Sequence, residues 1–239
     1  MCANYVPVTR RARLLSYFGV ERDRDESPAD TFPINVAPFI RLAKDGESEA
    51  PVVDDGLFGL LPHFASEVSF GRRTYNARSE TVHRLPSFRD AWANGQRCII
   101  PAEAIYEPNY ESGPSERWAI YQEGYVPFGI AGIYTQWRDF KTGRDVYSFS
   151  MITVNADDHP LLKRFHKPED EKRMVVILHP GDYAEWLACP VEEAKRFLKQ
   201  WTGPLLAEPL PLPPRAPKAS SVRTAKPRKP EPPETGRLF

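Results

Sequence analysis

Short runs of β-branched and aromatic residues recur through the middle of the chain, and they constrain its fold most strongly. Gly, Pro or Asp bounds each run, as is common where strands end. The runs cover residues 34–43, 57–61, 97–100, 117–122, 126–134, 146–154 and 173–178. Because such segments suit a pleated, half-buried surface, the sequence predicts a β-sheet as the core of the protein. Within 146–154, Tyr147, Phe149, Met151 and Thr153 are expected on one face.

Helical periodicity flanks these runs without alternating regularly with them. The segments with a helical apolar spacing are 11–18, 87–94, 158–165, 180–188 and 191–201. Regular alternation would indicate parallel βαβ units, so its absence favours an antiparallel sheet. Glu123-Gly124 separates two strand runs and predicts a tight hairpin. We therefore predict an α+β fold, a single domain with a mainly antiparallel, barrel-like β core and flanking helices.

Composition changes sharply after Trp201. Residues 202–239 contain ten prolines, seven Lys or Arg and three Glu, a net charge of +4. Because the whole chain sums to zero, the first 201 residues carry −4. A proline-rich, aromatic-poor segment cannot bury enough apolar surface to offset the entropy lost on ordering. We predict a folded domain over residues 2–201 and a disordered basic tail over residues 202–239.

The charge, the apolar runs and the cysteines of the sequence limit the kinds of partner and site that it can have. Because the chain has 32 basic and 32 acidic residues, its total charge does not favour nucleic acid, and a nucleic-acid partner would have to bind to a local basic patch. No run approaches the length of a membrane span, and the N-terminus lacks the apolar segment of a signal peptide, which predicts a cytoplasmic protein. Cys2, Cys98 and Cys189 are widely spaced and odd in number, which argues against a disulfide framework or a zinc site.

Cys2 is the residue with the most distinctive chemistry. Initiator methionine is commonly removed before a small residue, and its removal would leave an α-amine and a thiol on one carbon framework. An α-amine with a pKa of about 7.7–8.0 can attack an aldehyde, and the thiol can then close onto the imine to form a thiazolidine. The thiolate could instead attack an acyl carbon, as in an N-terminal-nucleophile amidohydrolase. A third reading is that Cys2 simply begins a strand.

Four further blocks of sequence follow Met1-Cys2 in a fixed order. They are Asn35-Val36-Ala37-Pro38, Tyr75-Asn76-Ala77-Arg78-Ser79-Glu80-Thr81, Pro101-Ala102-Glu103-Ala104-Ile105-Tyr106-Glu107, and His166 ahead of Lys172-Arg173-Met174-Val175-Val176-Ile177-Leu178. Together they resemble the SRAP family, the abasic-site processing proteins first described as SOS-response-associated peptidases. The resemblance covers most of residues 2–201.

The resemblance implies a protein that binds single-stranded DNA and joins covalently, through its N-terminal cysteine, to the ring-opened aldehyde of an abasic site. Lyase activity and self-release by the reverse reaction are implied as well, in a nucleoid-associated protein if the source is bacterial. No metal or organic cofactor is implied. Two rivals remain open: an N-terminal-nucleophile peptidase or amidase, and a non-enzymatic single-strand binder in which the basic tail supplies most of the affinity.

Carried over by position, four residues resemble the family's catalytic set. Cys2 resembles the crosslinking residue, and Asn76 the asparagine that orients the N-terminal amine without titrating. Glu107 resembles the glutamate that exchanges protons with the sugar hydroxyl and the carbinolamine. His166 resembles the histidine that helps to open the deoxyribose ring. The bland alternatives are a turn-forming Asn, a solvated Glu and a surface His.

The segment after His166 departs from the family pattern. Five extra residues separate His166 from Arg173, so either they loop out or another group replaces the imidazole. His159 is the nearest rival, although its Asp-Asp-His-Pro setting is typical of a helix start. Ala3-Asn4 also replaces the usual Gly-Arg after the cysteine, which removes an arginine that would bind phosphate beside the site.

DNA contacts are expected from Arg78 and Arg173, because guanidinium groups bind phosphate bidentately. Phe64 stands where family members often carry tryptophan, and its ring could support a base or sugar. Asn35 and Thr153 resemble pocket-lining polar residues. Solvated arginines, core packing of Phe64, and turn or strand hydrogen bonds are the alternatives. The ending Gly236-Arg237-Leu238-Phe239 resembles the Leu-Phe terminus of sliding-clamp ligands over only four residues, a likeness that would imply the replication machinery as a partner of the tail.

Overall fold

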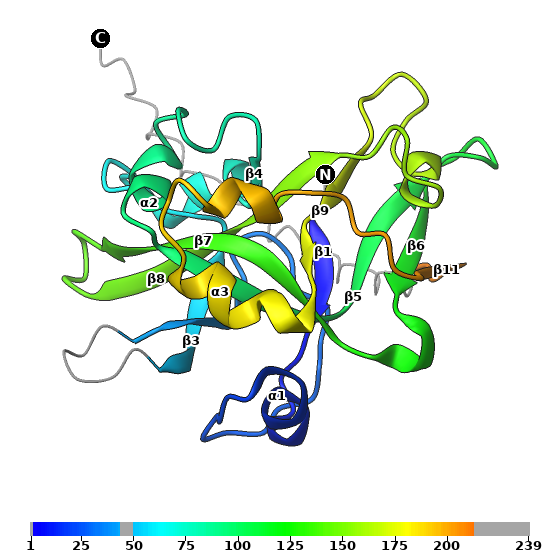
Figure 1. Ribbon diagram of the computed structural model, residues 1–239. Helices are drawn as coiled ribbons and strands as arrows, with labels where there is room; N and C mark the ends of the chain where they lie inside the picture. Colours follow the sequence, from blue (N-terminus) through cyan, green and yellow to red (C-terminus); the bar gives the residue numbers. More distant parts are fainter. Residues whose placement is uncertain (1, 44–49, 213–239) are drawn as a thin grey trace, which may run out of the picture.

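A five-stranded barrel forms the centre of the protein (Figure 1). The structure is a computed structural model that describes residues 2–43 and 50–212. The barrel strands are β2 (Val36–Leu42), β3 (Pro51–Phe58), β8 (Asp145–Asn155), β7 (Phe128–Arg138) and β5 (Arg97–Asn109). Each pairs with the next in that order, and Ile40 of β2 lies opposite Ile99 of β5 to close the ring. Only β3–β8 is parallel among these five pairs, so the predicted α+β, mainly antiparallel, barrel-like fold is confirmed.

Aromatic side chains fill the barrel. Phe149 lies 5.5 Å from Phe39 and 5.7 Å from Phe58 between ring centroids, and all three are fully buried. Phe149, Met151 and Thr153 of β8 are buried on their predicted common face. Ser148, Ser150 and Ile152 on the other face are buried too, because further chain covers β8 from outside. Burial on both faces is consistent with the absence of charged residues from positions 146–154.

The two halves of the long strand β5 pair with different strands. Residues 97–102 pair with β7, whereas residues 105–109 pair with β6 (Glu116–Tyr121). The predicted hairpin at Glu123-Gly124 is therefore wrong: β6 and β7 each find a partner in β5, and residues 123–125 form a 3-10 turn. β1 (Asn4–Pro7) pairs with residues 102–106 of β5. β5 thus carries its last residues beyond the barrel, alongside the N-terminus.

Two short strands lie on either side of the end of β8. β4 (Asn76–Arg78) pairs with residues 151–153 in parallel, and β9 (Arg173–Val175) pairs with residues 153–155 antiparallel. The predicted single strand 173–178 is split, because β10 (Ile177–Leu178) turns to pair with β7. The ends of β4, β8 and β9 therefore meet at one edge.

Helices are fewer than predicted. α1 (Arg11–Phe18) has its predicted bounds and ends at Gly19, whose φ of 66° suits the left-handed C-cap. α2 (Arg89–Ala93) and α3 (Tyr183–Ala188) lie within predicted helices. The helices predicted over 158–165 and 191–201 are wrong, because only the 3-10 turns Leu162–Arg164 and Ala194–Phe197 form there. Burial of Leu162, Ala194 and Phe197 is achieved by these single turns. No helix in the described ranges is long and apolar enough to cross a membrane.

The folded part continues past the predicted boundary at Trp201. β11 (Leu206–Pro209) pairs antiparallel with β6, with Leu206 opposite Tyr121 and Pro209 opposite Trp118. The free edge of β6 offers backbone hydrogen bonds that the composition of this segment does not reveal. The fold therefore includes β11, beyond the predicted boundary, and residues 213–239 of the predicted tail lie outside the described residues.

Candidate active site

Cys2 is buried just ahead of β1. Its side chain is 1% exposed, and its Sγ lies 3.5 Å from the carbonyl oxygen of Asn4. Asn76, the first residue of β4, donates from Nδ2 to the carbonyl oxygen of Cys2 at 2.7 Å. The Oδ1 atom of the same amide is buried and accepts no hydrogen bond from any residue that the structure describes. Asn76 thus fixes the backbone of Cys2, and its Oδ1 atom can still accept a hydrogen bond.

Glu107 and His166 lie next to each other within the fold. Glu107 is 2% exposed near the end of β5, and its Oε2 is 3.5 Å from Nε2 of His166. The main-chain N–H of His166 donates to the carbonyl oxygen of Pro108 at 2.8 Å. Its φ of 65° lies in the left-handed region, which non-glycine residues adopt mainly where the surroundings enforce it. The residues inserted after His166 therefore loop out and leave the imidazole beside Glu107.

The electrostatics of this cluster keep the thiol protonated. Burial raises the pKa of the Cys2 thiol well above its usual range, and the nearby Glu107 carboxylate raises this pKa further. Burial is the main cause that raises the pKa of Tyr75, and the nearby Cys2 and Glu107 raise it further. Tyr75 therefore borders the cluster, and its place directly before Asn76 in the motif was the signal that could have found it. The cluster of Cys2, Tyr75, Asn76, Glu107 and His166 is called the N-terminal site below.

Arg173 and Thr153 form a buried network beside β9. The guanidinium donates to both carboxylate oxygens of Glu80 at 2.9 Å, and to the carbonyl and hydroxyl oxygens of Thr153 at 2.7 and 3.2 Å. Arg173 is 2% exposed, and its own carbonyl oxygen lies 3.3 Å from Nε2 of His166. Glu80, whose role the sequence did not indicate, thus holds Arg173, and Arg173 contacts the histidine ring through its backbone.

Arg78 has a different environment. Its side chain is 47% exposed, and its Nη1 lies 2.8 Å from Oε2 of Glu171. Arg78 belongs to the same strand as Asn76, so one residue of β4 lies in the N-terminal site and another lies at the surface. The phosphate contacts predicted for Arg78 and Arg173 stay predictions, with Arg78 the more accessible of the two.

The remaining predicted residues make local contacts, and the DNA contacts predicted for Asn35, Phe64 and Thr153 stay predictions. Asn35 is exposed and accepts the N–H of Phe32 through Oδ1 at 3.0 Å, as a turn-forming asparagine does. Phe64 is 47% exposed and contacts Phe70 edge-on at 5.7 Å. His159 lies within hydrogen-bond distance of the carbonyl oxygen of Trp201, at 2.9 Å, and burial lowers its pKa. His159 therefore organises its own turn and does not replace His166 at Glu107.

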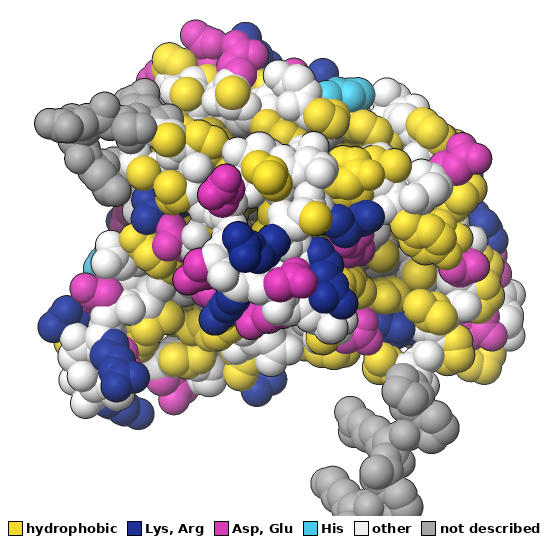
Figure 2. Space-filling model, turned by 90° about the horizontal axis from the view of Figure 1, so that it is seen from below, with side chains coloured by type: hydrophobic (Ala, Val, Ile, Leu, Met, Phe, Trp, Pro, Cys, Tyr) yellow, Lys and Arg dark blue, Asp and Glu magenta, His cyan; other side chains and the backbone are white. Residues whose placement is uncertain are grey.

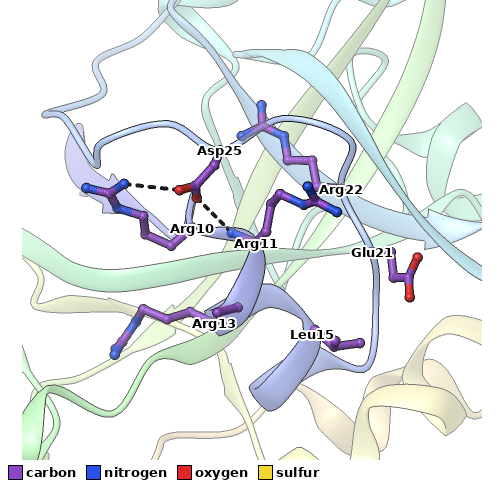
Figure 3. A pocket seen from close by; sticks show the side chains of 8 residues that line it. Arg10, Arg11, Arg13, Leu15, Glu21, Arg22 and Asp25 are labelled. Atoms are coloured by element: carbon purple, nitrogen blue, oxygen red, sulfur yellow. Dashed lines mark hydrogen bonds and ion pairs between the residues drawn. The ribbon is translucent and has the colours of Figure 1, made fainter.

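A separate cavity of about 700 Å³ lies beside α1, at the far end of β1 from the N-terminus (Figures 1 and 3). Asp25 accepts from Nη1 of Arg10 at 3.2 Å and from the backbone N–H of Arg11 at 3.1 Å, so a carboxylate already occupies the start of the helix (Figure 3). On this side of the molecule basic side chains are interleaved with acidic ones (Figure 2). None of the residues of the N-terminal site lines this cavity.

Known proteins resemble the chain in sequence and in fold. Abasic site processing protein YoqW of Bacillus subtilis (strain 168) is 27% identical over 191 residues, which cover 78% of this chain and 80% of that protein. Abasic site processing protein HMCES of Gallus gallus is 26% identical over 184 residues, covering 66% of this chain and 52% of that protein.

Solved structures give the same result. A crystal structure of a Bordetella bronchiseptica protein superposes with a TM-score of 0.79 at 36% identity, covering 88% of this chain and all of that one. A Bacteroides thetaiotaomicron protein, 24% identical, shares the fold with a TM-score of 0.73 over 87% of this chain and 92% of that one. Residues 1–211 match the family described as SOS response associated peptidase (SRAP), and the chain belongs to that family.

Proposed function

We propose that this protein processes abasic sites: it binds single-stranded DNA and, after removal of Met1, joins Cys2 covalently to the ring-opened abasic sugar. The observation that carries the proposal is the fixing of the Cys2 backbone by Asn76, in one buried site with Glu107 and His166. The names of the relatives, abasic site processing proteins, support the same substrate.

The chemistry begins with the α-amine of Cys2. Its nitrogen lone pair attacks the aldehyde carbon to give a carbinolamine, which loses water to form an imine. The thiol sulfur then adds to the imine carbon while its proton passes to nitrogen, which closes the thiazolidine ring. Oδ1 of Asn76 can accept a hydrogen bond from the amine without competing for its proton. The contact between Glu107 and His166 supports a role for this pair in proton transfer during the addition and dehydration steps.

The state of the thiol favours this order of steps. Burial, and then the charge of Glu107, raise the pKa of the Cys2 thiol and so disfavour the thiolate. An ordinary α-amine, with a pKa of about 7.7–8.0, is partly uncharged at neutral pH and attacks first. An N-terminal-nucleophile peptidase would need the thiolate at the outset. The protonated thiol therefore supports aldehyde capture over acyl transfer. Opening of the ring followed by hydrolysis of the imine gives self-release, and β-elimination from the imine gives strand cleavage.

Intact-mass spectrometry tests the proposal directly. Protein without Met1, mixed with single-stranded DNA containing one abasic site, should give a species equal to the two masses minus one water. The same strand with a tetrahydrofuran abasic analogue, which has no aldehyde, should give none. An adduct that formed equally with the analogue would overturn the aldehyde chemistry. A complex that vanished under denaturing conditions would indicate the non-enzymatic binder.

The basic tail is proposed to add DNA affinity without taking part in chemistry. Residues 213–239 carry seven Lys or Arg and two Glu, a net charge of +5. Truncation after Leu212 should weaken binding at moderate salt and flatten its salt dependence, because fewer counterions are released. Single-turnover crosslinking at saturating protein should be unchanged.

Truncation after Trp201 provides the contrast, since it also removes β11 from the edge of β6 and should lower stability to urea. A protein ending at Leu212 that bound normally but could not crosslink would contradict the assignment of the tail.

A further inference from the structure

The loop that follows His166 places a carboxylate on both arginines predicted to contact DNA. Glu171 lies in this loop, just before β9. Its Oε2 is 2.8 Å from Nη1 of Arg78, and its Oε1 is 2.7 Å from Nη1 of Arg173. One carboxylate thus bridges two guanidinium groups, as a phosphate group does with its oxygens. The side chain is 35% exposed, so solvent and ligands can reach it.

Neighbouring contacts hold Glu171 in this position. Asn155 at the end of β8 donates from Nδ2 to Oε1 of Glu171 at 3.3 Å. The next residue, Lys172, donates its backbone N–H to Asp157 at 2.9 Å and accepts from Ala156 at 2.8 Å. The loop is therefore attached to the chain that follows β8, and its carboxylate is positioned by the fold.

The two arginines depend on Glu171 to different degrees. Arg173 is also bound by Glu80 and Thr153, so its charge stays compensated when Glu171 leaves. For the Arg78 guanidinium, Glu171 is the one hydrogen-bond acceptor within the part of the chain that the structure describes. Displacement of Glu171 would leave Arg78 fully available and Arg173 still held. Exposed ion pairs are weak, so a DNA phosphate can compete for this position.

We propose that Glu171 occupies the position of a DNA phosphate across Arg78 and Arg173 and must be displaced when a strand binds. The inference rests on the proposed function. The carboxylate weakens reversible binding to every strand, including undamaged ones, whereas covalent capture retains a strand that carries an abasic aldehyde. Glu171 is thus a specificity-determining residue: it lowers occupancy on undamaged DNA relative to damaged DNA.

The test compares Glu171→Gln with Glu169→Gln, which removes the same charge from an exposed position in the same loop. Binding of an undamaged single-stranded oligonucleotide is measured by fluorescence anisotropy across a salt series. Glu171→Gln should bind about two- to fivefold more tightly at low salt, up to the limit expected for loss of one exposed ion pair. The gain in affinity should be largest at low salt and shrink as salt rises, because salt weakens the competing ion pair of wild type, so the log–log salt slope of Glu171→Gln should be the steeper one. Glu169→Gln should bind like wild type, within about twofold.

A second variant separates competition for the arginines from a general change of charge. In an Arg78→Gln background, Glu171→Gln should lose most of its gain in affinity, because the released guanidinium is missing. Equal tightening by Glu169→Gln and Glu171→Gln would overturn the proposal, as would weaker binding by Glu171→Gln. Crosslinking of wild type to abasic DNA is assayed separately: its absence would remove the proposed function, whereas unchanged Glu171→Gln affinity would remove only this inference.

Discussion

Replacement of Cys2 by Ala should abolish the heat-stable adduct with abasic DNA while leaving an imine that borohydride can trap. The α-amine that attacks the aldehyde is retained if Met1 is still removed, but no sulfur is present to close the ring. The readout is a denaturing gel of protein and abasic oligonucleotide, with and without borohydride, and with and without heating. The expected result is a complete loss of the unreduced, heat-stable band.

One residue added before Cys2 gives the complementary variant. It keeps the thiol but moves the free α-amine away from the carbon that bears it, so the stable adduct should again be lost. Both variants should bind undamaged single-stranded DNA like wild type, because neither changes Arg78 or the basic tail. A heat-stable, unreduced adduct from Cys2→Ala, or normal crosslinking by the extended protein, would show that the aminothiol mechanism is wrong.

Glu107→Gln should slow crosslinking by about 10²- to 10⁴-fold, the usual contribution of a positioned acid or base. The amide keeps the shape of the buried side chain and cannot donate or accept the proton next to His166. The rate is measured in single turnover across pH 6 to 8 with abasic single-stranded DNA.

The same substitution should change the thiol in the opposite direction. Because the charge of Glu107 raises the pKa of Cys2, its removal should lower that pKa and speed alkylation of Cys2 at a fixed pH. A thiolate-first peptidase mechanism would therefore be accelerated where aldehyde capture is slowed. Glu103→Gln, in the same strand but paired with Arg13, serves as the control and should crosslink at the wild-type rate. Wild-type rates for Glu107→Gln across this pH range would exclude the carboxylate from the mechanism.

The sequence correctly predicted the bounds of those helices and strands whose ends are set by residues next to them in the chain. α1 has its predicted bounds because Gly19 ends it in a left-handed conformation. The predicted helix over 191–201 failed because its apolar stripe is equally well buried by a single 3-10 turn, in which Ala194 and Phe197 face the core. Amphipathic spacing reports which side chains are buried, and it does not fix how many turns the backbone makes.

The sequence patterns did not predict which strands pair with each other. β6 and β7 are neighbours in sequence, yet both pair with β5, and β11 forms on the edge of β6 from a segment rich in proline. Strands pair through backbone hydrogen bonds, which every residue type except proline can form, so the local sequence does not specify which strands pair. Which edge is free depends on the assembled sheet.

The sequence by itself determined the chemistry available to this protein, because an aminothiol at Cys2 is a property of one residue and the motifs around Asn76 and Glu107 are contiguous. Only the tertiary structure decided how those groups are used. It brings His166 to Glu107 despite the inserted residues, and it buries the thiol so that its pKa rises. It also sets the carboxylate of Glu171 between Arg78 and Arg173. The physical reason is that pKa values and charge pairing depend on distance and burial, which arise where β4, β5, β8 and β9 come together from distant parts of the chain.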